Sequence, residues 1–122
     1  MLIFNEYKIT KMNLNTEVKS ISVKELSERM HSGEKIHVID VREPFEWEIC
    51  RIDKTLNIPM STLTKSIEKI PNSEPTVIMC HHGVRSFHVI QYLQTKGFNQ
   101  LMNLEGGIHA WALEIDEAMA RY

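Results

Sequence analysis

Two spacings of apolar residues alternate along this chain, one typical of buried strands and the other of amphipathic helices. Short runs of β-branched and other apolar residues predict strands. These runs lie at residues 36–40, 56–59, 76–80 and 101–104. Because segments with helical spacing separate them, the pattern predicts an α/β fold with a mainly parallel sheet.

Helices are expected where apolar residues recur three or four positions apart. The expected helices span residues 23–32, 61–70 and 85–96 and start again near 108, with a helical turn from 43–44. Ser22 and Glu25 form a capping-box pattern, and Gly33 stands where a left-handed C-terminal cap is favoured. Ser61 is expected to cap the second helix, which Pro71 ends.

Length and composition fit one globular domain. The chain has 122 residues, of which 43% are hydrophobic and 25% charged, and a domain of this size can bury a core without disulfides. The net charge of −2 argues against a nucleic-acid or membrane-surface binder, which would be clearly basic. The alternation of strand-like and helix-like segments begins near Ser20, so we expect a domain over residues 20–122. Residues 1–19 are expected to form an arm of uncertain order, and Met12 is an alternative start of the chain.

Two cysteines, Cys50 and Cys80, are too few for a disulfide-dense secreted scaffold or a four-cysteine zinc site. No run approaches the roughly 18 apolar residues of a membrane span. Residues 1–12 lack the apolar core of a signal peptide. A reduced, cytoplasmic protein is therefore expected.

Cys80 ends one predicted strand and is followed by a short loop and a helix that starts near Arg85. Such a loop can aim successive backbone N–H groups at the sulfur, and Gly83 provides the conformational freedom for a tight reversal. The helix N-terminus and Arg85 add positive charge, which favours thiolate over thiol. The pattern predicts an activated nucleophile in a small anion-binding cup. Asp40 ends another strand, and ligands of open α/β sheets bind beyond such ends.

An inert core cysteine is the commoner fate of a free thiol, but the residues that follow Cys80 argue for a reactive one. Cysteine phosphatases use a similar cup, with five residues between cysteine and arginine. Only four residues separate Cys80 from Arg85. The shorter loop suits one extra sulfur on cysteine better than a bound phosphoryl group.

Four segments together resemble the rhodanese family of sulfurtransferases. They are, in chain order, residues 40–47 (DVREPFEW), 57–59 (NIP), 80–86 (CHHGVRS) and 106–111 (GGIHAW). The likeness covers about residues 20–115 and is specific because all four stand in the family's order. It implies a single rhodanese domain, with helices on both faces of the sheet.

In that family the cysteine, here Cys80, takes the outer sulfur of an anionic donor such as thiosulfate and keeps it as a persulfide. The persulfide then gives sulfur to an acceptor, which is a thiol or protein in the cell and cyanide in the assay. The resemblance places the persulfide in a loop made of His81, His82, Gly83, Val84, Arg85 and Ser86. Backbone amides of this loop would stabilise it, and Arg85 would pair within the loop or with the donor's sulfonate.

The resemblance implies no cofactor beyond the covalent persulfide. Two rival functions stay open: a non-catalytic rhodanese-homology module that binds a partner protein, and a small-anion reductase or phosphatase. Asp40 and Arg42 would lie close to the loop by family analogy and brace it as a buried ion pair. Glu43, Glu46 and Glu48 are expected to form a solvated helix face.

Cys50 lies in a stretch, residues 50–55, that departs from the family pattern. Bulkier or charged groups replace two glycines and a histidine there. Cys50 either resolves the Cys80 persulfide by forming a disulfide or is an inert thiol that fills a turn.

The histidines divide into two groups. His81 and His82 either contact an anionic donor or acceptor or only face water. The others are His31, His37, His88 and His109. They are scattered at spacings unlike those of metal ligands, so no metal site is expected.

Overall fold

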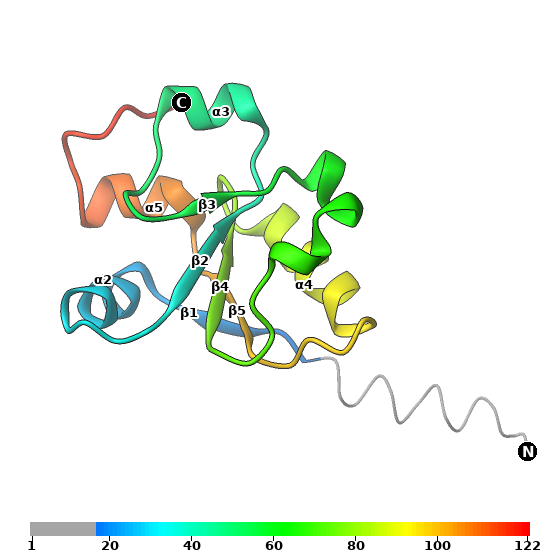
Figure 1. Cartoon of the computed structure of the whole chain (residues 1–122). Coiled ribbons are helices and arrows are strands. Elements are labelled where there is room, and N and C mark those ends of the chain that lie inside the picture. The colour runs from blue at the N-terminus through cyan, green and yellow to red at the C-terminus, as the bar shows by residue number, and fades with distance from the viewer. Residues whose placement is uncertain (1–16) are drawn as a thin grey trace, which may run out of the picture.

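A five-stranded parallel sheet forms the centre of the computed structural model, which describes residues 17–122 (Figure 1). In spatial order the strands are β1 (Lys19–Ile21), β5 (Leu101–Leu104), β4 (Thr76–Met79), β2 (His37–Asp40) and β3 (Leu56–Asn57). All the pairings between them are parallel. The predicted α/β class with a mainly parallel sheet is confirmed.

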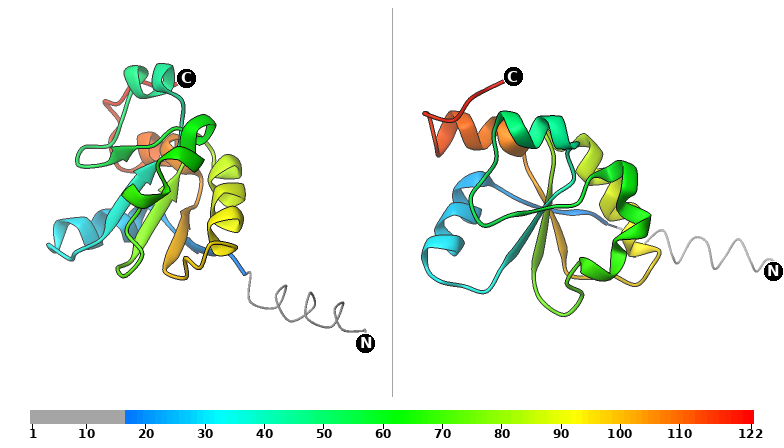
Figure 2. Two further views of the ribbon diagram at one scale, coloured as in Figure 1. Left: turned by 45° about the vertical axis from the view of Figure 1, so that its right-hand side comes forward. Right: turned by 45° about the horizontal axis from the view of Figure 1, so that its top comes forward.

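Helices cover both faces of the sheet, as predicted (Figure 2). They are α2 (Val23–His31), α3 (Pro44–Ile49), η1 (Met60–Lys65), η2 (Ile67–Lys69), α4 (Val84–Gln94) and α5 (Gly107–Glu114). Helices α2 and α5 pack on one face, and α4 with the two 3-10 helices packs on the other. Helix α3 lies beyond the carboxyl end of β2.

An apolar cluster lies on each side of the sheet because neighbouring side chains of a strand point to opposite faces. On one side, Ile78 of β4 packs in a cluster with Leu93 of α4. On the other side, Val77 of β4 packs in a cluster with Leu26 of α2 and Ile108 of α5. The central strand is therefore buried on both faces, and only the residues beyond its end are free to build a site.

Of the signals predicted at α2, the Ser22 cap and the left-handed Gly33 are present. The Ser22 hydroxyl oxygen accepts a 3.0 Å hydrogen bond from the Glu25 N–H. Gly33 follows the helix with a φ of 82°, a left-handed conformation that glycine adopts without strain. These short-range signals fix the ends of the first helix.

Two elements differ from the prediction. The helix expected over residues 61–70 is two short 3-10 helices, and Ser61 lies inside η1 rather than capping a helix. Its hydroxyl donates a 2.6 Å hydrogen bond to the Glu43 carboxylate, so a tertiary contact replaces the expected local one. The edge strand β1 was not predicted because it has three residues, of which only Ile21 is buried.

Within residues 17–122, none of the helices is long and apolar enough to cross a membrane. Met12 and most of the expected N-terminal arm lie outside the described residues.

Candidate active site

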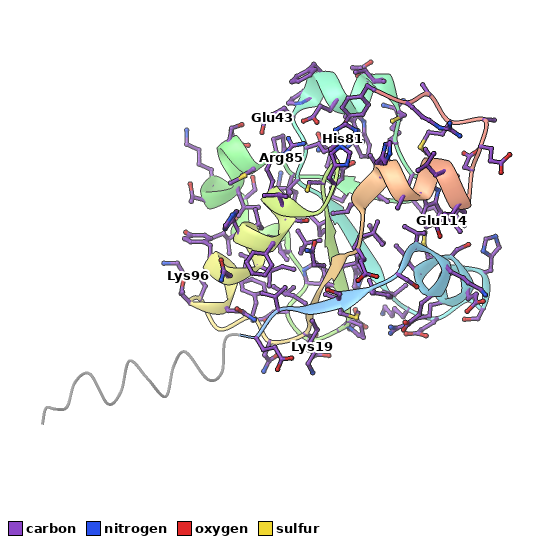
Figure 3. All side chains as sticks on the ribbon, turned by 180° about the vertical axis from the view of Figure 1, so that it is seen from behind. Lys19, Glu43, His81, Arg85, Lys96 and Glu114 are labelled. Atoms are coloured by element: carbon purple, nitrogen blue, oxygen red, sulfur yellow. The ribbon has the colours of Figure 1, made fainter. Side chains whose placement is uncertain are left out.

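The candidate site lies at the carboxyl end of the sheet, where β2 and β4 run side by side. Asp40 is the last residue of β2, and Cys80 directly follows β4. Figure 3 shows His81 and Arg85 at this end of the molecule, near α3. The sheet therefore brings together two segments that lie about forty residues apart in the sequence.

Cys80 is 1% exposed, and the loop that follows it wraps around its sulfur. The N–H groups of Gly83 and Ser86 point to Cys80 Sγ, with N···S distances of 3.1 and 3.4 Å. The Ser86 hydroxyl oxygen lies 3.3 Å from the same sulfur. Gly83 has a φ of 106°, which lets the chain turn back before α4 begins. The backbone geometry matches that of an anion-binding loop.

Asn103 of β5 holds this loop from outside. Its side-chain amide donates a 3.0 Å hydrogen bond to the Gly83 carbonyl, and its oxygen accepts one from the Ser86 hydroxyl. The residue is 9% exposed. Sequence analysis missed Asn103, although a lone amide in the apolar run 101–104 was a signal for a buried hydrogen-bonding role.

The first turn of α5 also holds the loop. The Ile108 N–H donates to the Cys80 carbonyl at 3.0 Å, and the His109 N–H donates to the His81 carbonyl at 3.1 Å. Gly107 has a φ of 61°, and a Cβ there would overlap both carbonyl groups. Glycine is therefore required for α5 to approach the loop this closely.

Arg85 forms a bidentate ion pair with Glu46 of α3, with N···O distances of 2.7 and 2.8 Å. The Glu46 side chain is 5% exposed, and the Arg85 side chain is 34% exposed. The Arg85 hydrogen bonds lower the pKa of Glu46 to about 2, although burial acts in the opposite direction. This pair joins the loop to α3, so Arg85 is fixed in place while about a third of its side chain stays exposed.

The pair bears on two expectations. Arg85 pairs with Glu46 of α3 rather than within the loop, and the expected contact with a donor stays a prediction. The expected solvated face of Glu43, Glu46 and Glu48 is wrong for two of its members, since Glu46 is buried and Glu43 binds Ser61. Only Glu48 is simply exposed.

Asp40 and Arg42 form the buried ion pair that sequence analysis expected. Both side chains are fully buried, and Arg42 Nη2 lies 2.7 Å from Asp40 Oδ2. The guanidinium also donates to the backbone carbonyls of Glu46 and Cys50, at 3.1 and 2.7 Å. Burial opposes its charge, but the hydrogen bonds to Asp40 and Tyr122 outweigh this and raise the pKa of Arg42. The pair therefore holds α3 through the Glu46 carbonyl within the helix and through the C-cap residue Cys50.

Tyr122 links these groups and was missed by sequence analysis. Its hydroxyl accepts from Arg42 Nη1 and donates to Glu46 Oε2, both at 2.9 Å. Its ring stacks on His81, with centroids 3.8 Å apart and planes inclined by 10°. Burial raises the pKa of Tyr122 to about 12, so the phenol is neutral near pH 7. Nothing local in the sequence around Tyr122 signalled this role.

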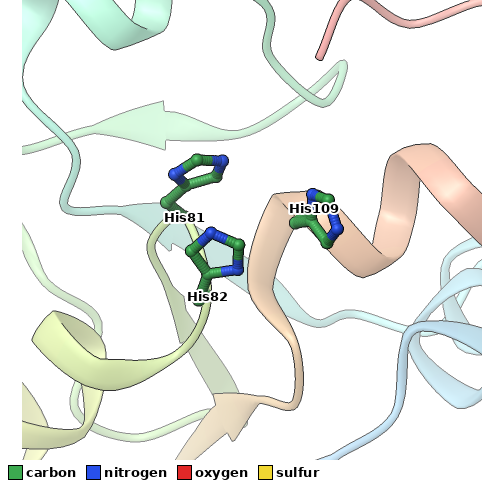
Figure 4. Close-up of side chains that lie close together, drawn as sticks. All are labelled: His81, His82 and His109. Atoms are coloured by element: carbon green, nitrogen blue, oxygen red, sulfur yellow. The ribbon is translucent and has the colours of Figure 1, made fainter. Parts of the chain in front are cut away.

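Three histidines meet above the loop (Figure 4). His81 and His82 come from the loop, His109 comes from α5, and one ring nitrogen of each lies within 4.8 Å of the others. Burial and the neighbouring His82 lower the pKa of His81. The expectation that His109 is isolated from the other histidines is wrong, because the backbone contacts of α5 bring it to the loop.

Cys50 is half-buried at the C-terminal end of α3, and both cysteines are unpaired. Its sulfur lies 3.9 Å from Arg42 Nη1. It lines a small pocket together with His81, His109 and Tyr122.

Comparisons with known proteins point to one family. A family model described as "Rhodanese-like domain" matches residues 22–114. The chain is 36% identical over 105 residues to a probable adenylyltransferase/sulfurtransferase, MoeZ, of Mycobacterium tuberculosis, and the match covers 84% of this chain but only 27% of that relative. It is 35% identical to a protein named sulfurtransferase from Allochromatium vinosum, over 78% of this chain and 89% of the relative. A rhodanese-related protein from Thermoplasma volcanium has a similar structure, with a TM-score of 0.71 and 33% identity over 80% of this chain and 93% of that one.

Proposed function

The chain belongs to the rhodanese family, and from this membership we propose that it is a sulfurtransferase that carries sulfane sulfur on Cys80. The observation that supports this most directly is the position of the Cys80 sulfur. Two backbone N–H groups, from Gly83 and Ser86, converge on it inside a loop fixed by other elements. A thiolate, or a persulfide one sulfur longer, is the kind of anion that such a loop stabilises.

The proposed reaction has two balanced half-reactions. The Cys80 thiolate attacks the outer sulfur of thiosulfate, a sulfur–sulfur bond forms, and the donor's own sulfur–sulfur bond breaks. Sulfite leaves with the electron pair, and the cysteine keeps a negatively charged persulfide. An acceptor, cyanide in the assay or a thiolate in the cell, then attacks the terminal sulfur. This second displacement restores the Cys80 thiolate, so the cycle needs no cofactor beyond the covalent persulfide.

Charge around the loop favours an anionic donor. Arg85 is held by Glu46, but 34% of its side chain is exposed and can attract sulfonate oxygens. His81 and His82 lie at the opening and can donate to the same oxygens. In this proposal Asp40 and Arg42 position α3 and, through Tyr122 and Glu46, the loop. The cellular donor is thiosulfate or a persulfide, and the acceptor is a small thiol or a protein thiol.

Intact mass after thiosulfate treatment tests the central step. The wild-type protein is expected to gain one sulfur atom, to lose it on addition of cyanide, and to produce thiocyanate in the same amount. Cys80→Ser is expected to do neither, whereas Cys50→Ser, the matched control, is expected to behave as wild type. Absence of thiocyanate from the wild type, or equal product from Cys80→Ser, would overturn the proposal.

The same measurements separate the rival functions. A non-catalytic partner-binding module would give no thiocyanate and no added sulfur. A phosphatase would release phosphate from an aryl phosphate, and Cys80→Ser would abolish that release. The loop has four residues between Cys80 and Arg85, so we expect sulfur transfer and no phosphate release.

A further inference from the structure

We propose that His81, His82 and His109 form a binding site for a divalent transition-metal ion, such as Zn²⁺, at the opening of the Cys80 loop. The metal site does not rest on sulfur transfer being the function, although His81 and His82 are also the residues proposed above to contact the donor. Imidazole nitrogen is a preferred ligand of Zn²⁺, Ni²⁺ and Cu²⁺. Figure 4 shows the three rings gathered around one region of space.

The spacing of the ring nitrogens is close to that of a coordination site. One nitrogen from each ring lies within 4.8 Å of the others. Zinc–nitrogen bonds of about 2.0–2.1 Å in a tetrahedral site separate ligand nitrogens by roughly 3.4 Å. Ring rotations that move each nitrogen by about 1 Å close this difference. His82 is exposed and can rotate freely, so the adjustment does not disturb the core.

The protein backbone holds the rings together without a metal. The His109 N–H donates to the His81 carbonyl at 3.1 Å, so the two residues cannot separate unless α5 leaves the loop. His82 directly follows His81, and the centroids of their rings are 4.0 Å apart. The Tyr122 ring stacks on His81 and limits the tilt of that imidazole. His81 and His109 are therefore already held close together before an ion binds, which favours affinity, and His82 is the ring that has to be ordered.

His109 supplies a separate observation that points to a ligand at this place. Its Nδ1 atom is buried and has no hydrogen-bond partner within the described part of the chain. Buried polar nitrogens are almost always paired, because an unpaired one loses its bond to water and gains nothing. A coordination bond to a metal ion at Nδ1 would satisfy this atom.

Three protein ligands leave one tetrahedral position open. That is the coordination found in catalytic rather than structural zinc sites, where water or a substrate takes the fourth position. At this place the fourth ligand is expected to be water or a small anion that enters the loop opening. Cys80 is buried and its sulfur faces the loop amides, so we expect nitrogen ligands alone from the protein.

Binding of Zn²⁺ to the metal-free protein, in competition with a coloured chelator, tests the site. We expect one ion per wild-type chain. His109→Gln and His82→Gln should each weaken affinity at least about tenfold, the lower limit for losing even a group that only supports a ligand. His88→Gln, which changes an exposed histidine of α4, is the matched control and should bind as wild type. Because His82 is exposed, its variant tests the site even if His109→Gln unfolds.

Co²⁺ as a second probe identifies the ligands. Nitrogen coordination is expected to give only weak visible bands, whereas a thiolate ligand adds a strong near-ultraviolet charge-transfer band. The proposal would be overturned by a charge-transfer band in the Co²⁺ spectrum. It would also be overturned if His82→Gln bound Zn²⁺ as tightly as wild type, or if the wild-type protein did not bind one ion per chain. None of these results bears on sulfur transfer, which is measured with metal-free protein.

Discussion

Glu46→Gln is the substitution whose consequence follows most directly from the structure. The Glu46 side chain is buried, being only 5% exposed, and glutamine has nearly the same size. The substitution therefore keeps the packing and removes the negative charge that faces Arg85. The carboxylate also accepts hydrogen bonds from Tyr122 and from the Glu43 N–H. The amide that replaces it could donate or accept at each place, but it would leave the guanidinium without its counter-ion.

The pKa of Glu46 gives the magnitude. It is about 2 in the folded protein, against 4.5 for the free group. That difference corresponds to about 3 kcal/mol at neutral pH. Breaking a buried ion pair typically costs about 3–5 kcal/mol. Arg85 is partly exposed and can regain water, which places the expected loss at the lower end, about 3 kcal/mol. Such a loss leaves a typical domain folded.

Acid should remove this contribution. Folding lowers the pKa of Glu46, so its stabilisation is complete above about pH 4.5 and is lost as the pH falls towards 2. In urea unfolding we expect Glu46→Gln to be about 3 kcal/mol less stable than wild type at pH 7, with the gap shrinking between pH 5 and pH 2. Glu48→Gln, on an exposed position of the same helix, should stay within about 0.5 kcal/mol of wild type. A stability gap below about 0.5 kcal/mol at pH 7, or one that does not change with pH, would show that the ionised Glu46 does not stabilise the fold.

Three further substitutions, with Gly97→Ala as a control for one of them, test how the loop and α3 are held. Asn103→Ala removes both side-chain hydrogen bonds to the loop. We expect thiocyanate formation to fall roughly 10- to 100-fold, because the loop would be less well positioned. Wild-type activity would show that Asn103 does not position the loop. Gly107→Ala should lower the free energy of unfolding by about 2–4 kcal/mol, because its Cβ would overlap loop carbonyls. Gly97→Ala, at a φ of 95° with open space around it, should cost only about 1–2 kcal/mol, and equal losses for the two would refute the overlap argument. Asp40→Asn leaves the buried charge of Arg42 unpaired and should cost about 3–5 kcal/mol in urea unfolding, whereas a loss below about 1 kcal/mol would show that the pair does not brace α3.

Short-range signals account for most of what the sequence predicted correctly. The apolar runs at β2 and β4, and the residues that bound α2, depend on spacing and on single neighbours. The geometry of the Cys80 loop also follows from a local pattern, a strand end followed by glycine and a helix start. These features were predictable because the residues that create them are adjacent in sequence.

Long-range pairing accounts for most of the errors. Glu46 belongs to an acidic helix and reads as solvated until Arg85, 39 positions later, is placed beside it. Tyr122 reaches Arg42 across 80 positions, and His109 becomes a neighbour of His81 only when α5 docks on the loop. Apolar spacing over residues 61–70 suits 3-10 turns as well as an α-helix, and it gives no sign that Ser61 bonds to Glu43. The spacing of apolar residues does not show which side chains, far apart in the sequence, pair with one another.

The segments that hold the Cys80 loop in place are synthesised after the loop itself. Cys80 emerges from the ribosome before Asn103 and before the first turn of α5, yet these segments hold the loop around the sulfur. Contacts between distant segments form late in folding because closing the intervening chain costs entropy. A nascent chain therefore carries Cys80 without the hydrogen bonds that surround its sulfur in the folded protein. Under the proposed function, sulfur loading of Cys80 has to wait until the chain has folded through α5.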